Sequence, residues 1–119
     1  MSLVQEQSEF LLDVAKLILF AHTKGWRVTG GELFRTLEQQ KIHYNAGRSK
    51  TMDSYHLKRL AIDLNFFKPK SVMPTYNKSE LEMFGQYWED LNPVNRWGGN
   101  FSADFEDTPH FERRYKKES

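Results

Sequence analysis

The run of mostly apolar residues at positions 60–67 most constrains how this chain can fold, because Asp63 is the only charged residue in it. A short apolar run of this kind is typical of a strand that is buried on both faces. A carboxylate in such a strand costs free energy unless a partner compensates its charge. The sequence therefore predicts a central strand whose aspartate is paired with another group.

Three helices are expected around this strand. Apolar residues recur every three or four positions between residues 4 and 22, which indicates an amphipathic helix whose apolar stripe faces the core. A second helix is expected from Thr36, its N-cap, to Gly47. A capping box of Ser79 and Glu82 predicts the start of a third helix, which an Asn-Pro pair ends after residue 91.

Two further strands are expected, at residues 26–29 and 110–115, while residues 68–78 and 97–105 read as loops. The sequence contains no internal repeat and no linker between domains. We therefore predict one α+β domain over residues 1–119, with a small antiparallel sheet of about three or four strands and helices packed around it. A chain of 119 residues buries roughly two thirds of the surface that it exposes when unfolded.

Composition excludes several classes of protein. The chain has no cysteine, which rules out disulfide scaffolds, zinc fingers with thiolate ligands and cysteine nucleophiles. The formal net charge of +1 gives no electrostatic signature of nucleic-acid binding. The apolar residues 17–21 follow several acidic ones and precede no small-residue cleavage site, so we expect neither a signal peptide nor a membrane span, and we expect synthesis in the cytoplasm.

Two histidines and one aspartate suggest a metal site. His56 and Asp63 are seven residues apart, which would separate them by about 10 Å along a helix and place them on opposite faces of a strand. They can share a metal only if the chain bends near Arg59, and His110 would then supply a third ligand. Two histidines and an aspartate with an open fourth position are typical of catalytic zinc. Taken singly, each histidine is more often a hydrogen-bonded residue than a ligand.

Three segments in order resemble one family of enzymes. Residues 54–63 read SYHLKRLAID, similar to the signature SxHxxGxAxD, with Arg59 in place of the glycine. Residues 97–112 begin WGG and end DTPHFE, similar to WGG…DxPHFE. Residues 35–49 carry RTLEQQ, then Tyr44 and GRS, similar to RSxxxQ…LY…GRT. These motifs resemble those of the zinc peptidases that include VanY-like D-alanyl-D-alanine carboxypeptidases and phage L-alanyl-D-glutamate endopeptidases.

The resemblance implies a role for each matching residue. One zinc ion per chain would be held by His56, Asp63 and His110 at one end of the sheet, as in the hedgehog and D,D-peptidase fold. Asp107 would be the general base, with the segment to His110 held extended by Pro109. The resemblance also implies four residues around the substrate. Arg35 or Arg48 would be the cation for the oxyanion or a substrate carboxylate, and Arg35 is favoured as the catalytic one because the family has an arginine at its position. Ser54 would be a hydrogen-bonding residue, and Trp97 would be a wall of the cleft. Glu106 and Glu112 are alternative carboxylates.

The resemblance implies hydrolysis of peptidoglycan stem peptides, and the segment from residue 35 to 49 favours the bond between L-alanine and D-glutamate. Two alternatives stay open: a D-alanyl-D-alanine carboxypeptidase, and a catalytically silent module that binds the cell wall and keeps the metal for stability. We expect a monomer that binds no nucleic acid, inserts stably in no membrane, and reaches the periplasm and cell wall through a holin lesion.

Overall fold

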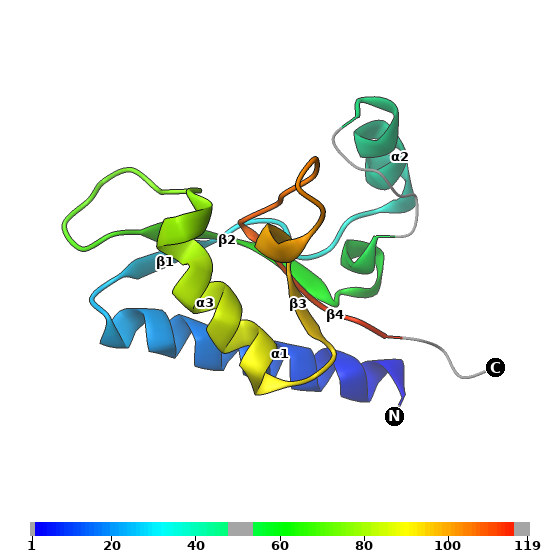
Figure 1. Cartoon of the computed structure of the whole chain (residues 1–119). Coiled ribbons are helices and arrows are strands. Elements are labelled where there is room, and N and C mark those ends of the chain that lie inside the picture. Colours follow the sequence, from blue (N-terminus) through cyan, green and yellow to red (C-terminus); the bar gives the residue numbers. More distant parts are fainter. Residues whose placement is uncertain (1, 48–53, 116–119) are drawn as a thin grey trace.

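The computed structural model describes residues 2–47 and 54–115 of the chain. Its helices are α1 (Leu3–Thr23), α2 (Leu37–Asn45) and α3 (Lys78–Leu91), with two short 3-10 helices, η1 (Tyr55–Lys58) and η2 (Gly98–Asn100). Its strands are β1 (Arg27–Gly30), β2 (Ala61–Phe67), β3 (Asn95–Trp97) and β4 (His110–Arg113). They form one antiparallel sheet in the order β1-β2-β4-β3, which confirms the predicted α+β class (Figure 1).

Side-chain caps explain where the helices begin. Thr36 caps α2 as predicted, because its hydroxyl accepts a hydrogen bond from the backbone N–H of Gln39. The predicted cap of α3 was wrong. Asn77, two residues before Ser79, accepts the hydrogen bond from the backbone N–H of Glu80, and the Ser79 hydroxyl donates to Asn77 instead.

The sheet differs from the prediction at one edge. Residues 95–97 form β3, whereas the sequence indicated a loop from Trp97 onward. Arg96 pairs with Glu112 of β4, and Trp97 pairs with Phe111. A strand of three residues is too short to produce a recognisable alternation of apolar and polar side chains, so pairing with β4 decides its conformation.

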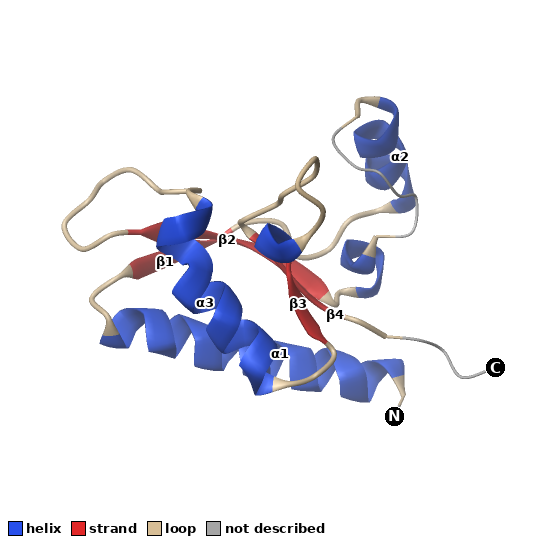
Figure 2. Ribbon diagram, viewed as in Figure 1, coloured by secondary structure: helices blue, strands red, loops and turns tan. Residues whose placement is uncertain are grey.

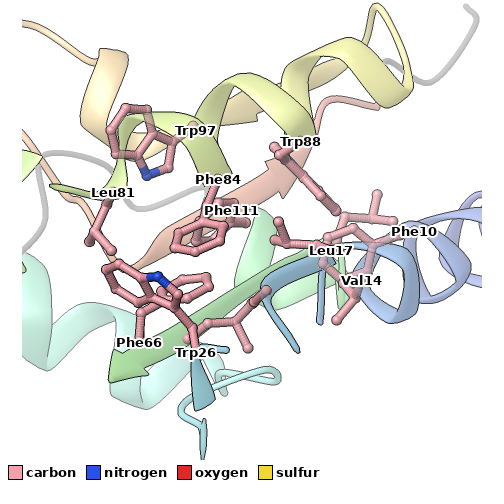
Figure 3. Close-up of a cluster of buried hydrophobic side chains, with 13 residues drawn as sticks. Phe10, Val14, Leu17, Trp26, Phe66, Leu81, Phe84, Trp88, Trp97 and Phe111 are labelled. Atoms are coloured by element: carbon pink, nitrogen blue, oxygen red, sulfur yellow. The ribbon is translucent and has the colours of Figure 1, made fainter. Parts of the chain in front are cut away.

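The hydrophobic core lies between one face of the sheet and two helices. Figure 2 shows α1 and α3 together on one side of the strands, with α2 set apart from them. Phe66 of β2 stacks on Phe84 of α3 with ring centroids 4.6 Å apart, and Phe10 of α1 meets Trp88 of α3 edge to face (Figure 3). Burial of one such side chain stabilises the fold by roughly 1.5–3 kcal/mol.

The opposite face of the sheet carries the polar residues of β2. Because side chains alternate along a strand, Leu64 and Phe66 point to the core while Asp63 and Asn65 point away from it. His110 pairs directly with Asp63, so both belong to this outer face. Within the described residues, no helix is both long and apolar enough to cross a membrane.

Candidate metal centre

The structure brings together the three predicted metal ligands. Asp63 of β2 and His110 of β4 are directly paired across the sheet, and His56 comes from η1. One ligand atom from each residue lies within 4.8 Å of the others. The two ring nitrogens that face Asp63 Oδ1 are His56 Nε2 and His110 Nδ1, each 3.5 Å away.

The bend predicted between His56 and Asp63 is present. The short helix η1 ends at Arg59, whose φ of 55° and ψ of 38° place it in the left-handed region. This is the position of the glycine in the family signature, and a residue with a Cβ atom pays about 1–2 kcal/mol to adopt that conformation. The Arg59 guanidinium lies 4.2 Å from the centre of the Phe34 ring, a favourable contact that offsets part of this cost.

Backbone contacts fix the orientation of His56. Its Nδ1 lies 3.0 Å from the carbonyl oxygen of Leu33, so Nδ1–H donates and Nε2 is left as the acceptor. The Ser54 hydroxyl caps η1 by accepting a hydrogen bond from the backbone N–H of His56. Ser54 is buried in this role, and its contact with substrate stays a prediction.

Glu112 holds the second histidine. His110 Nε2 lies 2.7 Å from Glu112 Oε1, and Arg114 Nε donates to the other carboxylate oxygen at 3.0 Å. A carboxylate that accepts the outer N–H of a histidine orients the ring and raises the basicity of its other nitrogen. The contact between His110 and Glu112 could have been predicted from the sequence, because residues two apart on a strand have side chains on the same face.

The three residues fit a bound metal ion. His56 Nε2 and Asp63 Oδ1 are buried and have no hydrogen-bond partner among the described residues. Buried polar atoms without a partner are rare in folded proteins and need an explanation. Two imidazole nitrogens and one carboxylate oxygen that converge on one point form a suitable donor set for a divalent cation.

Charge interactions inside the site shift the pKa values of Asp63 and His110. Burial favours a higher pKa for Asp63, but interactions with His110 and His56 outweigh it and hold the pKa well below its usual value. Burial favours a lower pKa for His110, but interactions with Asp63 and Glu112 raise it to about 9. A metal ion held by these residues would supply positive charge beside Asp63 in place of the proton on His110.

Asp107 lies just outside this group of ligands. Its Oδ2 is 3.9 Å from His110 Nδ1, and burial raises the pKa of its carboxyl group. The expected extended segment was wrong: residues 107–110 form a turn, closed by a hydrogen bond from the His110 N–H to the Asp107 carbonyl. Gly98 permits this turn, since a Cβ there would lie 2.1 Å from the same carbonyl oxygen.

Trp97 does not line a cleft, which corrects the prediction. Its side chain is fully buried in the core, where it covers Gly85 of α3 and Gly99 of η2. Its indole N–H donates to the carbonyl oxygen of Thr108 at 2.8 Å. Trp97 therefore supports the turn that carries Asp107 and His110 rather than contacting substrate.

Arg35 lies beside the ligands, with its backbone N–H donating to the His56 carbonyl. Its guanidinium donates to Glu32 and, at 2.6 Å, to the side-chain oxygen of Gln40. Glu32 also approaches His43 at 3.9 Å. The other predicted cation, Arg48, lies outside the described residues.

Comparisons with known proteins give a family and a shared fold. A family model described as D-alanyl-D-alanine carboxypeptidase matches residues 47–113. The L-alanyl-D-glutamate peptidase of Listeria phage A118 is 36% identical over 102 residues, which cover 85% of this chain and 35% of that protein, so this chain spans about a third of its relative's length. The crystal structure of the Serratia marcescens L-Ala D-Glu endopeptidase ChiX shares the fold, with a TM-score of 0.66 and 22% identity over 86% of this chain and 78% of that one.

Proposed function

This chain belongs to the D-alanyl-D-alanine carboxypeptidase family of metallopeptidases, and on that premise we propose that it is a zinc enzyme that hydrolyses peptidoglycan stem peptides at the L-alanyl-D-glutamate bond. The name of the phage relative, an L-alanyl-D-glutamate peptidase, supports the choice of this bond. The observation that carries the proposal is the convergence of His56, Asp63 and His110, with a fourth carboxylate, Asp107, adjacent to them.

The ligand set favours a catalytic site. Three protein ligands leave a coordination position for water or substrate, whereas structural zinc sites usually have four protein ligands. A bound zinc ion would lower the pKa of water toward about 7 and polarise the scissile carbonyl group. His56 and His110 are held in position by Leu33 and Glu112, so the donor atoms are preorganised.

The remaining roles follow from what each side chain can reach. Asp107 acts as the general base, which takes a proton from the attacking water and passes it to the leaving amine. Burial raises the pKa of Asp107, which brings it nearer to the working pH of a base. Arg35, with Arg48 as the alternative, supplies positive charge for the oxyanion or for a substrate carboxylate.

Two other functions remain as alternatives. The description of the matching family favours a D-alanyl-D-alanine carboxypeptidase, which would release free D-alanine. A silent wall-binding module would keep the metal for stability alone. The position of Asp107 argues against this module, since a structural metal site needs no half-buried carboxylate beside its ligands.

The proposal extends to the cellular setting. Peptidoglycan is the partner, each chain holds one zinc ion and acts as a monomer, and the protein reaches the cell wall through a holin lesion. The phage origin of the relative supports this route.

Two synthetic peptides test the choice of bond. One contains the L-alanyl-D-glutamate bond in a stem peptide without D-alanine, and the other ends in D-alanyl-D-alanine but lacks D-glutamate. We expect the zinc-loaded protein to cleave only the first, and His110→Ala to cleave neither. Cleavage of the second peptide alone would favour the carboxypeptidase, and zinc binding without cleavage of either would favour the silent module.

A further inference from the structure

A cluster of neutral hydrogen-bonding groups lies next to the metal centre on the outer face of the sheet. Asn65 follows Asp63 by two residues on β2, so its side chain is on the same face at a distance of about 7 Å along the strand. Its amide nitrogen donates to the Thr29 hydroxyl at 3.3 Å, and its amide oxygen accepts a hydrogen bond from the Tyr76 hydroxyl at 2.8 Å. We call Thr29, Asn65 and Tyr76 the hydroxyl-amide cluster.

Hydrogen bonds connect this cluster to the site. The carbonyl oxygen of Tyr76 accepts a hydrogen bond of 2.7 Å from the Thr108 hydroxyl, and Thr108 lies in the turn between Asp107 and His110. Thr75, the neighbour of Tyr76, pairs with Phe66 of β2. Tyr76 is nevertheless 49% exposed, so its aromatic ring is accessible to a ligand, while its hydroxyl donates to Asn65.

The two sides of the metal centre differ in charge. On the His56 side lie two charged side chains, Arg35 and Glu32, which pair with each other. On the Asn65 side, the three members of the hydroxyl-amide cluster are all uncharged at neutral pH. Figure 1 shows α2 and the loop between β2 and α3 on opposite sides of the molecule. A substrate that spans the centre therefore meets charged groups, Arg35 among them, at one end and the uncharged cluster at the other.

The proposed substrate has the same asymmetry. On one side of the scissile bond, D-glutamate carries a free carboxylate. On the other side, a single alanine joins the peptide to the lactyl group of a sugar with hydroxyl and acetamido groups. One extended residue spans about 3.5 Å, so with the lactyl group the sugar ring comes within reach of a cluster about 7 Å from Asp63.

We propose that the hydroxyl-amide cluster is a subsite for the N-acetylmuramoyl sugar at the amino end of the stem peptide. Neutral amide and hydroxyl groups pair with the hydroxyl and acetamido groups of a sugar without the desolvation cost of a charge. The exposed Tyr76 ring offers an apolar surface for a sugar ring. With the sugar at this cluster, the bound substrate has one orientation: the glycan lies over β1 and β2, and D-glutamate lies toward Arg35. This inference rests on the proposed function for its substrate.

The test compares two substrates of the same peptide sequence, one with and one without the disaccharide of N-acetylglucosamine and N-acetylmuramic acid. We expect Asn65→Ala and Tyr76→Phe each to lower the preference for the sugar-bearing substrate, as a ratio of kcat/KM values, by about threefold to tenfold, the effect of one lost hydrogen bond. Tyr87→Phe on α3, where the ring stacks on Phe20, is the matched control and should keep the native ratio. Equal losses on both substrates, or an unchanged ratio, would overturn the subsite.

Direct binding of the disaccharide separates this inference from the proposed function. Titration of the native protein with the disaccharide should shift the NMR signals of the Asn65 side-chain amide, and Tyr76→Phe should weaken the binding. Sugar binding by a protein that cleaves neither peptide would support the subsite and contradict the proposed function. Cleavage of the peptides without any binding of the disaccharide would overturn the subsite and leave the proposed function intact.

Discussion

Gly31 and Asp63 are in direct contact through their backbones: the Gly31 N–H donates to the Asp63 carbonyl at 2.7 Å. A Cβ atom on Gly31 would lie 2.9 Å from that oxygen and 3.2 Å from the Asp63 Cβ. The next hydrogen bond runs from the Asp63 N–H to the Glu32 carbonyl. The chain after β1 can therefore lie against Asp63, one of the three proposed ligands, only because residue 31 has no side chain.

Gly31→Ala should displace Asp63. The added methyl group overpacks the contact, which we expect to destabilise the fold by about 1–3 kcal/mol and to weaken zinc binding. Gly30→Ala is the matched control, since a Cβ atom there meets nothing within 4 Å. Urea unfolding and zinc titration of both variants provide the measurement. Equal behaviour of the two variants would show that the Gly31 contact does not constrain the site.

Glu112→Gln should weaken metal binding without removing a ligand. The amide is a poorer acceptor for the His110 Nε2–H, so the ring loses orientation and basicity. Loss of such a contact typically lowers metal affinity by about 10-fold to 100-fold. Glu106→Gln, whose side chain is exposed and pairs with Lys78, is the control and should keep native affinity in a competition assay with a chelating dye. Native affinity in Glu112→Gln would argue against this role.

The stability of the metal-free protein should decrease as the pH rises. The pKa of His110 in the folded chain is about 9, above its usual value of 6.5, so its protonation stabilises the fold fully below pH 6.5 and no longer does so above about pH 9. Urea unfolding of the metal-free protein between these pH values measures the decrease. His110→Asn should flatten this profile, and an unchanged slope in that variant would assign the effect to another group.

Asp107→Asn should separate catalysis from metal binding. The variant keeps the size of the side chain and all three ligands, so we expect native zinc content and a rate lowered by about 100-fold or more. Activity of the native enzyme should fall on the acid side as Asp107 is protonated. Because burial raises the pKa of Asp107, this fall should begin at a higher pH than for an ordinary aspartate. A native rate in the variant would remove Asp107 from the mechanism.

The sequence predicted the parts of the fold that strong local patterns encode. The spacing of apolar residues gave α1, and the apolar run around Asp63 gave β2. The proximity of His56, Asp63 and His110 was also predicted, because the family signatures contain all three residues, and the structure makes the required bend at Arg59.

Features that depend on tertiary contacts were missed or wrong. The family signature predicted Trp97 as a wall of the cleft, but its contacts with Gly85 and Gly99 make it part of the core. The turn at residues 107–110 depends on Gly98, which approaches it from η2. No local pattern encodes these contacts, since each joins segments whose positions are set by packing of the whole domain.

Digestion of purified peptidoglycan sacculi, with identification of the new termini by mass spectrometry, tests the central claim most directly. The zinc-loaded protein should release peptides with a new amino-terminal D-glutamate and leave glycan strands that end in L-alanine, while the Asp107→Asn protein should release few. Free D-alanine as the sole product, or intact sacculi after treatment with zinc-loaded native protein, would contradict this account.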